Sequence, residues 1–236
     1  MTTVMWGFLI ALGIVAFIVF IVLRIKKISM PALVAKSITS FVFVATAGYA
    51  VVAREDAAPY AMLVMLGLVA GLLGDIWLDL KWIYKSGERQ FTYWGFASFL
   101  AGHVFYLAAI LLANGAAVDR RWYILAAGAS LVIAALQMVI TKKQNDYTGY
   151  RTITYIYTVF LLMTMLSSFL CMISNDFSKN TILFFAGSVF FTISDAVLCS
   201  TYFDRKQDKN TKPYIFVNHL TYYLGQFLIA VSVFYT

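Results

Sequence analysis

Residues 59–80 read PYAMLVMLGLVAGLLGDIWLDL, an apolar run in which Asp75 and Asp79 are the only charged residues. A helix that rises about 1.5 Å per residue needs about 20 residues to cross the roughly 30 Å hydrocarbon core of a bilayer. In lipid, the backbone of such a run has to form its hydrogen bonds within itself. The run therefore predicts a transmembrane helix that carries a carboxylate inside the membrane.

Runs of the same kind recur along the whole chain. Of its 236 residues, 62% are hydrophobic and 12% are charged, whereas soluble domains are nearly half apolar and about a quarter charged. The runs are continuous, unlike the ten-residue alternation of barrel strands. We predict an all-α integral membrane protein, one polytopic domain over residues 1–236, with eight transmembrane helices at residues 4–23, 32–53, 59–80, 94–113, 121–141, 150–173, 181–200 and 214–235.

The basic residues are unevenly divided among the predicted loops. Because cytoplasmic loops hold an excess of Lys and Arg, we expect the odd-numbered loops to be cytoplasmic and both termini to be outside, in the cell (inner) membrane if the source is bacterial. The net charge of +7 then reflects topology and contact with membrane lipids, and no nucleic-acid partner is expected. The odd loops hold Arg24, Lys26, Lys27, Lys81, Lys85, Arg89, Lys142, Lys143, Arg151, Arg205, Lys206, Lys209 and Lys212, and the even loops hold Arg54, Arg120, Arg121 and Lys179.

The two halves of the chain, residues 1–118 and 119–236, resemble each other. Residues 73–78 (LGDIWL) match residues 193–198 (ISDAVL) at an offset of 120, and residues 100–105 (LAGHVF) match residues 223–228 (YLGQFL) at an offset of 123. Four spans per half would give both halves the same direction across the membrane. We predict parallel repeats related by an axis along the membrane normal.

Two carboxylates, Asp75 and Asp195, lie at matched depth inside the third and seventh spans. An intramembrane Asp costs about 2.5–3.5 kcal/mol on insertion scales, and it normally faces the bundle interior and marks a functional site. The competing interpretation is a pair of hydrogen-bonded or ion-paired carboxyls that only hold helices together. Asp79, one turn beyond Asp75, is interpreted as a solvated carboxylate at the interface.

Other polar side chains fall within the predicted spans. Lys36 enters the second span from the cytoplasmic side, where it could snorkel to the interface, pair with Asp75 or Asp195, or bind a lipid phosphate. His103, with Tyr106 on the same helix face, is expected at the depth of the carboxylates or slightly deeper. In the eighth span a polar stripe either forms interhelical hydrogen bonds or lines a site; it consists of Asn218, Tyr222, Tyr223 and Gln226.

Tyrosines are concentrated in residues 147–157. Such a stretch is typical of the aromatic belt at a membrane interface. Tyr155 and Tyr157 could instead face inward.

Four of these elements in series resemble the YhhN-type lysoplasmalogenase family. They are Leu73-Gly74-Asp75, residues 102–106 (GHVFY), residues 194–198 (SDAVL) and residues 221–230 (TYYLGQFLIA). Lys36 fits the family as well, whereas Ser37 stands where proline is common and Gly225 where alanine is usual. The resemblance implies eight spans and an enzyme that hydrolyses the vinyl ether bond of lysoplasmalogens to a fatty aldehyde and a glycerophospho-base. It also implies that Asp75 and Asp195 are the catalytic pair.

Vinyl ether hydrolysis begins with protonation of the β-carbon, and water then captures the resulting oxocarbenium-like cation. The site needs one acid and one anion, which two neighbouring carboxyls can supply by dividing into protonated and ionised forms. Sequence leaves open which aspartate holds the proton. We expect His103 or Gln226 to position the water and Lys36 to hold the phosphate of a lysophospholipid substrate, with no cofactor and no metal.

Three other functions compete with this interpretation. A zinc hydrolase would need about three protein ligands, and the chain has only two histidines, His103 and His219. A proton-coupled transporter of small molecules or lipids also suits parallel repeats with buried carboxylates. Carriers often break helices at the midplane, whereas Pro31, Pro59 and Pro213 all lie at span ends. A purely structural protein leaves the matched aspartates without a reason.

Overall fold

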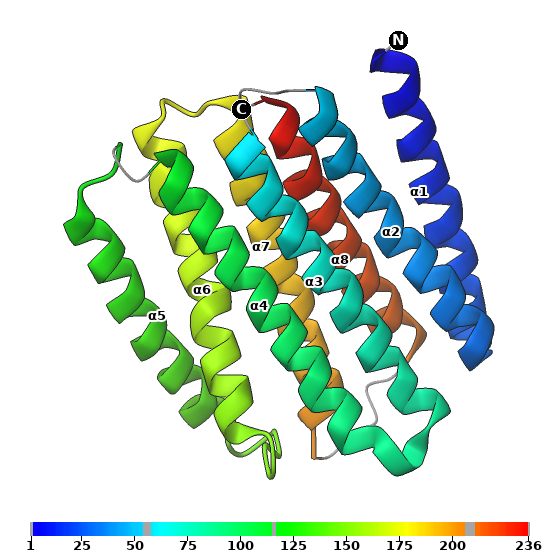
Figure 1. Cartoon of the computed structure of the whole chain (residues 1–236). Coiled ribbons are helices and arrows are strands. Elements are labelled where there is room, and N and C mark those ends of the chain that lie inside the picture. Colours follow the sequence, from blue (N-terminus) through cyan, green and yellow to red (C-terminus); the bar gives the residue numbers. More distant parts are fainter. Residues whose placement is uncertain (1, 54–57, 115–116, 206–210, 236) are drawn as a thin grey trace.

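The computed structural model describes residues 2–53, 58–114, 117–205 and 211–235 (Figure 1). In these ranges the α-helices are α1 (Thr2–Ile25), α2 (Ser29–Ala53), α3 (Ala58–Ile83), α4 (Glu88–Asn114), α5 (Arg120–Thr141), α6 (Arg151–Ser174), α7 (Lys179–Phe203) and α8 (Lys212–Ser232), with short 3-10 helices η2 (Lys85–Gly87) and η3 (Val233–Tyr235). The described residues form no strand, only an isolated bridge between Asn145 and Asp204. The predicted all-α class is confirmed.

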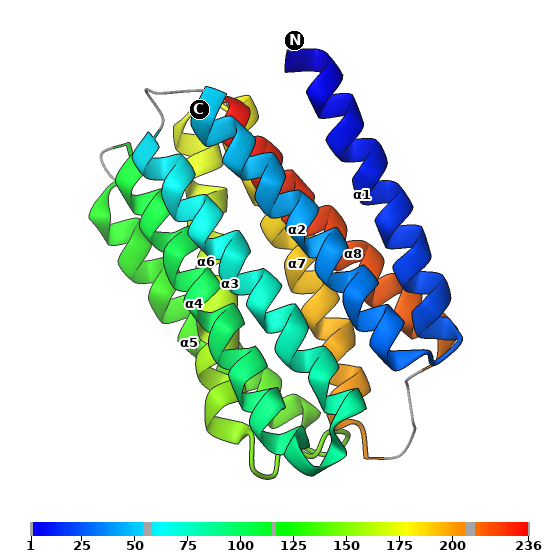
Figure 2. The ribbon, with the colours of Figure 1, turned by 45° about the vertical axis from the view of Figure 1, so that its right-hand side comes forward.

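The helices lie side by side with their axes roughly aligned, and consecutive helices run in opposite directions (Figure 1, Figure 2). Both termini lie at the same end of the bundle. At the opposite end, α1 is joined to α2, α3 to α4 and α5 to α6. The last residue of α7, Phe203, and the first of α8, Lys212, lie at this end as well. We call this the basic end, because the described members of the thirteen predicted cytoplasmic basic residues lie there. Arg54, Lys206 and Lys209 lie outside the described residues.

Within the described ranges, seven helices, α1 to α7, are long and apolar enough to cross a membrane. The eighth, α8, has 21 residues but does not meet the hydropathy of a span. Its inward face is the reason, because this face carries buried polar residues that lower the average: Asn218, Tyr222, Tyr223, Gln226 and Ser232. The structure thus shows a multi-pass architecture, and the eighth crossing stays a prediction.

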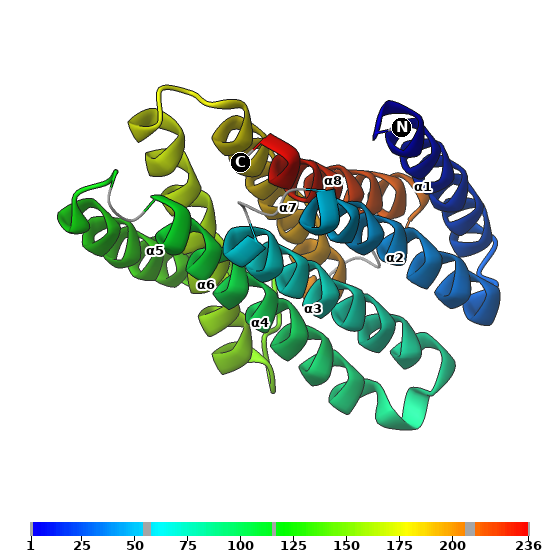
Figure 3. The ribbon, with the colours of Figure 1, turned by 45° about the horizontal axis from the view of Figure 1, so that its top comes forward.

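Helix contacts follow the same pattern in both halves. In the first half α1 packs on α2, α2 on α3, α3 on α4, and α4 on α6. In the second half α5 packs on α6, α6 on α7, α7 on α8, and α8 on α2. The corresponding helices α1 and α5 lie at opposite edges of the bundle (Figure 3). Two four-helix repeats would produce such contacts, and the repeat stays a prediction.

Glycines allow the helices of the α3–α4 and α7–α8 pairs to approach closely. A Cβ on Gly102 of α4 would lie 3.1 Å from the carbonyl oxygen of Gly67 on α3, and a Cβ on Gly225 of α8 would lie 2.8 Å from that of Gly187 on α7. The two contacts are related by the same offsets as the sequence repeat, 120 and 123 residues. Small residues at such crossings are the usual means of close helix packing in membranes.

Alanine at position 225 is expected to destabilise the protein by about 1–3 kcal/mol through overpacking. The new methyl group would lie 2.8 Å from the Gly187 oxygen and 2.9 Å from the Phe191 nitrogen, which are backbone atoms. Gly128→Ala on α5 is the matched control, since a Cβ there meets nothing within 4 Å. Thermal unfolding in detergent measures both, and a wild-type melting temperature for Gly225→Ala would contradict this packing.

The three prolines lie in the first turns of α2, α3 and α8. A proline is tolerated there because the first N–H groups of a helix have no partner within the helix. The helices around the bundle centre therefore contain no proline break, as the sequence indicated.

Candidate active site

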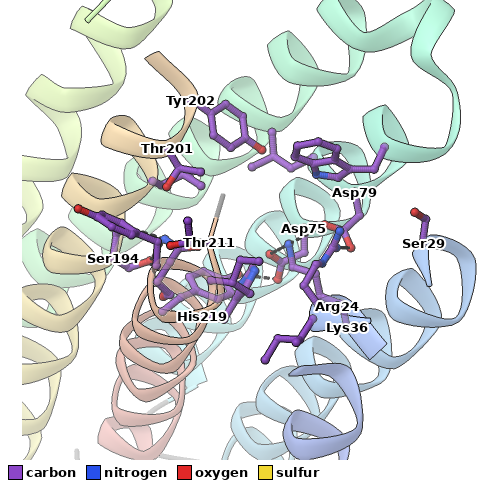
Figure 4. Close-up of a pocket in the computed structure, with 18 of the residues that line it drawn as sticks. Arg24, Ser29, Lys36, Asp75, Asp79, Ser194, Thr201, Tyr202, Thr211 and His219 are labelled. Atoms are coloured by element: carbon purple, nitrogen blue, oxygen red, sulfur yellow. Dashed lines mark hydrogen bonds and ion pairs between the residues drawn. The ribbon is translucent and has the colours of Figure 1, made fainter. Parts of the chain in front are cut away.

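A cavity of about 660 Å³ lies at the basic end, bounded mainly by α1, α2, α3, α7 and α8 (Figure 4). This volume is within the range of small-molecule sites. The side chains of Arg24, Lys36, Asp75 and Asp79 gather on one wall, and Ser194 and Thr201 of α7 lie on another. Asp195 of α7 also lines the cavity. Both carboxylates singled out from the sequence therefore line the same cavity.

Asp75 and Asp195 occupy equivalent places on their helices. Asp75 is eight residues before Ile83, the last residue of α3, and Asp195 is eight residues before Phe203, the last residue of α7. At 1.5 Å per residue, each is about 12 Å from the end of its helix. The two carboxylates therefore lie at the same distance from the basic ends of their helices, as the sequence predicted. Both helices are longer than the predicted spans, which ended at residues 80 and 200.

Asp75 is held by three donors and is 2% exposed. Lys36 Nζ of α2 lies 3.1 Å from Oδ1. The hydroxyls of Ser40 and Tyr222 donate to Oδ2 over 2.6 Å and 2.7 Å. An ionised carboxylate is an acceptor only, so this set of donors fits the ionised form of Asp75.

Asp79 is buried, and the interpretation of it as a solvated interfacial carboxylate is wrong. Its carboxylate pairs with Arg24 of α1, and its Oδ1 lies 3.2 Å from Lys36 Nζ. Arg24, Asp79, Lys36 and Asp75 thus form a chain of alternating charges that sums to zero, which is how buried ions are tolerated. The signal in the sequence was the four-residue spacing of Asp75 and Asp79, which places them on one helix face.

Asp195 has a different environment from Asp75. Tyr157 of α6 donates a hydrogen bond to Oδ2. Among the described residues, no Lys, Arg or His nitrogen lies within 4 Å of this carboxyl group. Both carboxyl groups line the cavity, but Asp195 is partly exposed whereas Asp75 is almost fully buried. Within the described ranges, Asp195 is therefore the cavity carboxyl without a counter-ion, and its partial exposure leaves it open to a ligand.

A hydrogen-bond network from α8 and α4 supports Asp75. Gln226 Nε2 donates to the Tyr222 hydroxyl over 3.3 Å, and Tyr106 donates to Gln226 Oε1 over 2.8 Å. Tyr223 contacts Ser40 and the carbonyl oxygen of Lys36. Of the four network residues on α4 and α8, Tyr222 lines the cavity. Tyr106, Tyr223 and Gln226 do not line it and form a second layer of hydrogen bonds around Tyr222, Ser40 and Lys36.

Asn218 of α8 lines the cavity and fixes α8 to α7. Its Nδ2 donates to the carbonyl oxygen of Ser194 over 2.8 Å, and Ser194 Oγ donates back to the Asn218 carbonyl over 3.0 Å. Ser194 precedes Asp195 in the chain, so this pair of bonds positions the helix turn that carries the carboxyl. The polar stripe of α8 thus forms hydrogen bonds between helices, and two of its members, Asn218 and Tyr222, also line the cavity.

His103 does not line the cavity. It lies deeper than expected, because α4 begins at Glu88 and not at residue 94, which places His103 fifteen residues along the helix. Its Nδ1 lies 3.2 Å from Thr164 Oγ1, and its Nε2 is buried with no hydrogen-bond partner among the described residues. The structure thus does not bring His103 together with the two carboxylates.

Three exposed lysines, Lys27, Lys85 and Lys212, line the mouth of the cavity. No carboxylate among the described residues lies within 4 Å of them. The sequence placed all three in cytoplasmic loops, but only the structure shows that they surround one opening. In contrast, Lys36 is already engaged by two carboxylates.

Among the described residues, no group of three His, Cys, Asp or Glu side chains is arranged to hold a metal ion. The clustered side chains are cations, carboxylates and hydroxyls instead. This donor set suits proton transfer and the binding of a polar group.

The model of the YhhN family matches residues 32–233 of the chain. Comparisons with curated proteins and with solved structures find no match. The matched range contains Lys36, the cavity carboxylates Asp75, Asp79 and Asp195, and the supporting network of α8. Arg24 of α1 and Lys27 lie before it.

Proposed function

The chain belongs to the YhhN family, and on this premise we propose that it is a membrane-embedded hydrolase that cleaves the vinyl ether bond of a lysoplasmalogen or a related lysolipid. The products would be a fatty aldehyde and a glycerophospho-base. One observation carries the proposal: two intramembrane carboxyls with different partners, Asp75 and Asp195, line one cavity at the basic end.

The reaction requires a proton donor beside an apolar double bond. Protonation of the β-carbon gives an oxocarbenium-like cation, water adds to the adjacent carbon, and the hemiacetal collapses to aldehyde and alcohol. General acid catalysis of such a step contributes about 10²–10⁴-fold. A carboxylic acid and a carboxylate on either side of the reacting atoms are the arrangement used for glycosyl cations.

In our proposal Asp195 is the acid and Asp75 is the anion. Among the described residues Asp195 has no cationic partner, so its neutral form loses no ion pair there, and it lines the cavity. Asp75 accepts from Lys36, Ser40 and Tyr222, which hold it as a carboxylate. After donating its proton to carbon, Asp195 would be a carboxylate and would take the proton of the attacking water.

The lysines at the mouth are proposed to hold the lipid phosphate, a role that the sequence had suggested for Lys36. Because Lys36 pairs with Asp75 and Asp79, binding a phosphate there would disrupt two ion pairs. Among the described residues Lys27, Lys85 and Lys212 form no ion pair, and with the basic end in the cytoplasm they would lie near the phosphates of the inner leaflet, each worth about 1 kcal/mol to an anionic surface.

Replacing Lys27, Lys85 and Lys212 together by alanine is expected to raise KM by on the order of a hundredfold, at about 1 kcal/mol for each lysine, with little change in kcat. The matched control is Lys26→Ala, the neighbouring exposed lysine that does not line the cavity. Steady-state kinetics in mixed micelles measure both. A fall in kcat at constant KM would show that the lysines act in another way.

We also propose that α8 is the eighth span and that the basic end is cytoplasmic, so that both termini are outside. The 21 residues of α8 cover about 30 Å, and its polar residues face inward, where the neighbouring helices shield them from lipid. The cavity would then open at the level of the inner head groups.

The activity is tested with three lysolipids of equal chain length, one with a vinyl ether, one with a saturated ether and one with an ester. Mass spectrometry of the products is expected to show aldehyde from the vinyl ether alone. Cleavage of the ester would indicate a lysophospholipase. Uptake into liposomes without any product would indicate the alternative, a proton-coupled lipid or small-molecule transporter.

A further inference from the structure

Asp195 also forms part of the wall of a second, smaller cavity. This cavity has a volume of about 70 Å³ and lies among α4, α6 and α7, with Gln137 contributed by α5. Three residues of α7 line both cavities, namely Asp195, Leu198 and Tyr202. Their spacing of three and four residues places them on one face of α7, so this face separates the two spaces. Asp75 lines only the larger cavity.

The chemistry of the second cavity is different from that of the first. Apart from Asp195 its lining contains no charged residue. Apolar side chains, among them Phe96, Leu161, Leu162 and Phe203, stand beside uncharged polar ones, namely Gln137, Thr154, Tyr157, Thr158, Thr192 and Tyr202. The larger cavity, in contrast, contains two cation–carboxylate pairs and the lysines at its mouth. Asp195 therefore stands at a boundary between a charged compartment and an uncharged one that contains most of the apolar lining side chains named above.

The small cavity reaches the outer surface of the bundle. Its lining includes Ala196, which is exposed, and Gln137 and Thr158, which are half-buried. Helices α5 and α7 both pack on α6, and we call this small cavity, with Gln137 of α5 at its edge, the crevice. A volume of 70 Å³ is only about twice the share of one water molecule in the liquid. The cavity can hold the first carbons of a chain, and the remainder would lie in the bilayer.

We propose that this crevice binds the hydrocarbon chain of a lysolipid, next to the bond that is cleaved. This inference rests on the proposed function. In a lysoplasmalogen the vinyl ether joins a polar glycerophosphate to an apolar chain, so a matching site has a polar space on one side of the acid and an apolar space on the other. The β-carbon lies on the chain side and the ether oxygen on the head-group side. Asp195, which borders both cavities, would lie beside the β-carbon, and Asp75, which lines only the larger cavity, would lie on the side of the ether oxygen.

Leu198 is the apolar member of the three α7 residues that separate the head-group space from the chain space. It lies one turn beyond Asp195 and is partly buried, with cavity on both sides. Chain entry from the bilayer between α5 and α7 would bring the double bond directly to the Asp195 carboxyl group.

The first test is binding, and it does not depend on turnover. The probe is a saturated 1-O-alkyl lysophosphocholine with a diazirine on the third carbon of the chain, which the proposed reaction cannot cleave. After photolysis in nanodiscs, we expect peptide mass spectrometry to find the label within residues 154–162 and 192–203. Labelling confined to α1, α2 or α8, or labelling that excess unmodified lysolipid does not reduce, would overturn the inference.

The second test uses chain length. Thr158→Trp would fill the crevice, so the ratio of kcat/KM for an octadecenyl to a propenyl glycerophosphocholine is expected to fall at least tenfold. Ile156→Trp is the control, because Ile156 lies on the same helix, is exposed and does not line the cavity; its ratio should equal that of the wild type. Equal losses for both chain lengths in Thr158→Trp would overturn the inference. If the wild type hydrolyses neither substrate, the proposed function fails, and the photolabel alone decides where the chain binds.

Discussion

Replacing Asp195 by asparagine is expected to reduce kcat for lysoplasmalogen hydrolysis by about a thousandfold or more, with little change in KM. An amide has the size of the carboxyl group but has no proton acidic enough to give to carbon, so the full contribution of the general acid is lost, about 10²–10⁴-fold. The Tyr157 hydroxyl can still donate to the amide oxygen. We therefore expect Asp195→Asn to fold like the wild type.

Two further variants test whether the loss is specific to the acid at position 195. Asp176→Asn changes an exposed carboxylate at the opposite end of the bundle and should retain wild-type turnover. Asp195→Glu keeps an acid but moves it by one methylene group, and should recover part of the lost activity. Wild-type turnover in a folded Asp195→Asn protein would remove Asp195 from the reaction.

Replacing Asp75 by asparagine is expected to reduce kcat by on the order of 10²–10³, the loss typical when a group that stabilises developing charge is removed. The alternating chain of Arg24, Asp79, Lys36 and Asp75 is neutral as a whole. Without the Asp75 charge, the wall of the cavity would have a net charge of +1 beside a cationic transition state. The stability should fall as well, since Lys36 would lose one of its two partners.

A double variant separates these two effects of Asp75. Lys36→Met alone leaves the buried Asp75 with no cationic partner, and breaking a buried pair in this way costs about 3–5 kcal/mol. Combined with Asp75→Asn, it restores a neutral wall and should recover most of the stability in thermal unfolding. Turnover should remain below that of the wild type, because no carboxylate stands beside the substrate. Full recovery of kcat would mean that Asp75 only balances the charge of Lys36.

The intramembrane carboxylates were predictable from the sequence because an ionisable residue in an apolar helix is costly, and because two of them recur at an offset of 120 residues. The polar stripe of α8 was predictable for the same reason. These signals depend only on position along a helix. They therefore survive errors of several residues in the predicted ends of the spans.

Errors in the helix ends account for what the sequence did not predict. Because α3 continues to Ile83, Asp79 lies inside the bundle, where Arg24 and Lys36 reach it. Because α4 begins at Glu88, His103 lies deeper than the cavity. The lysines at the mouth come from three separate loops or helix ends, and their meeting is a property of the tertiary structure.

The most direct measurement is mass spectrometry of the aldehyde that purified protein releases from a lysoplasmalogen in D₂O, trapped rapidly as a hydrazone. If a protein acid protonates the β-carbon, the wild type should release aldehyde with one deuterium on the carbon next to the carbonyl group, and Asp195→Asn should release almost none. Unlabelled aldehyde, incubated under the same conditions, controls for exchange. Absence of aldehyde, or aldehyde without deuterium at that carbon, would contradict the mechanism.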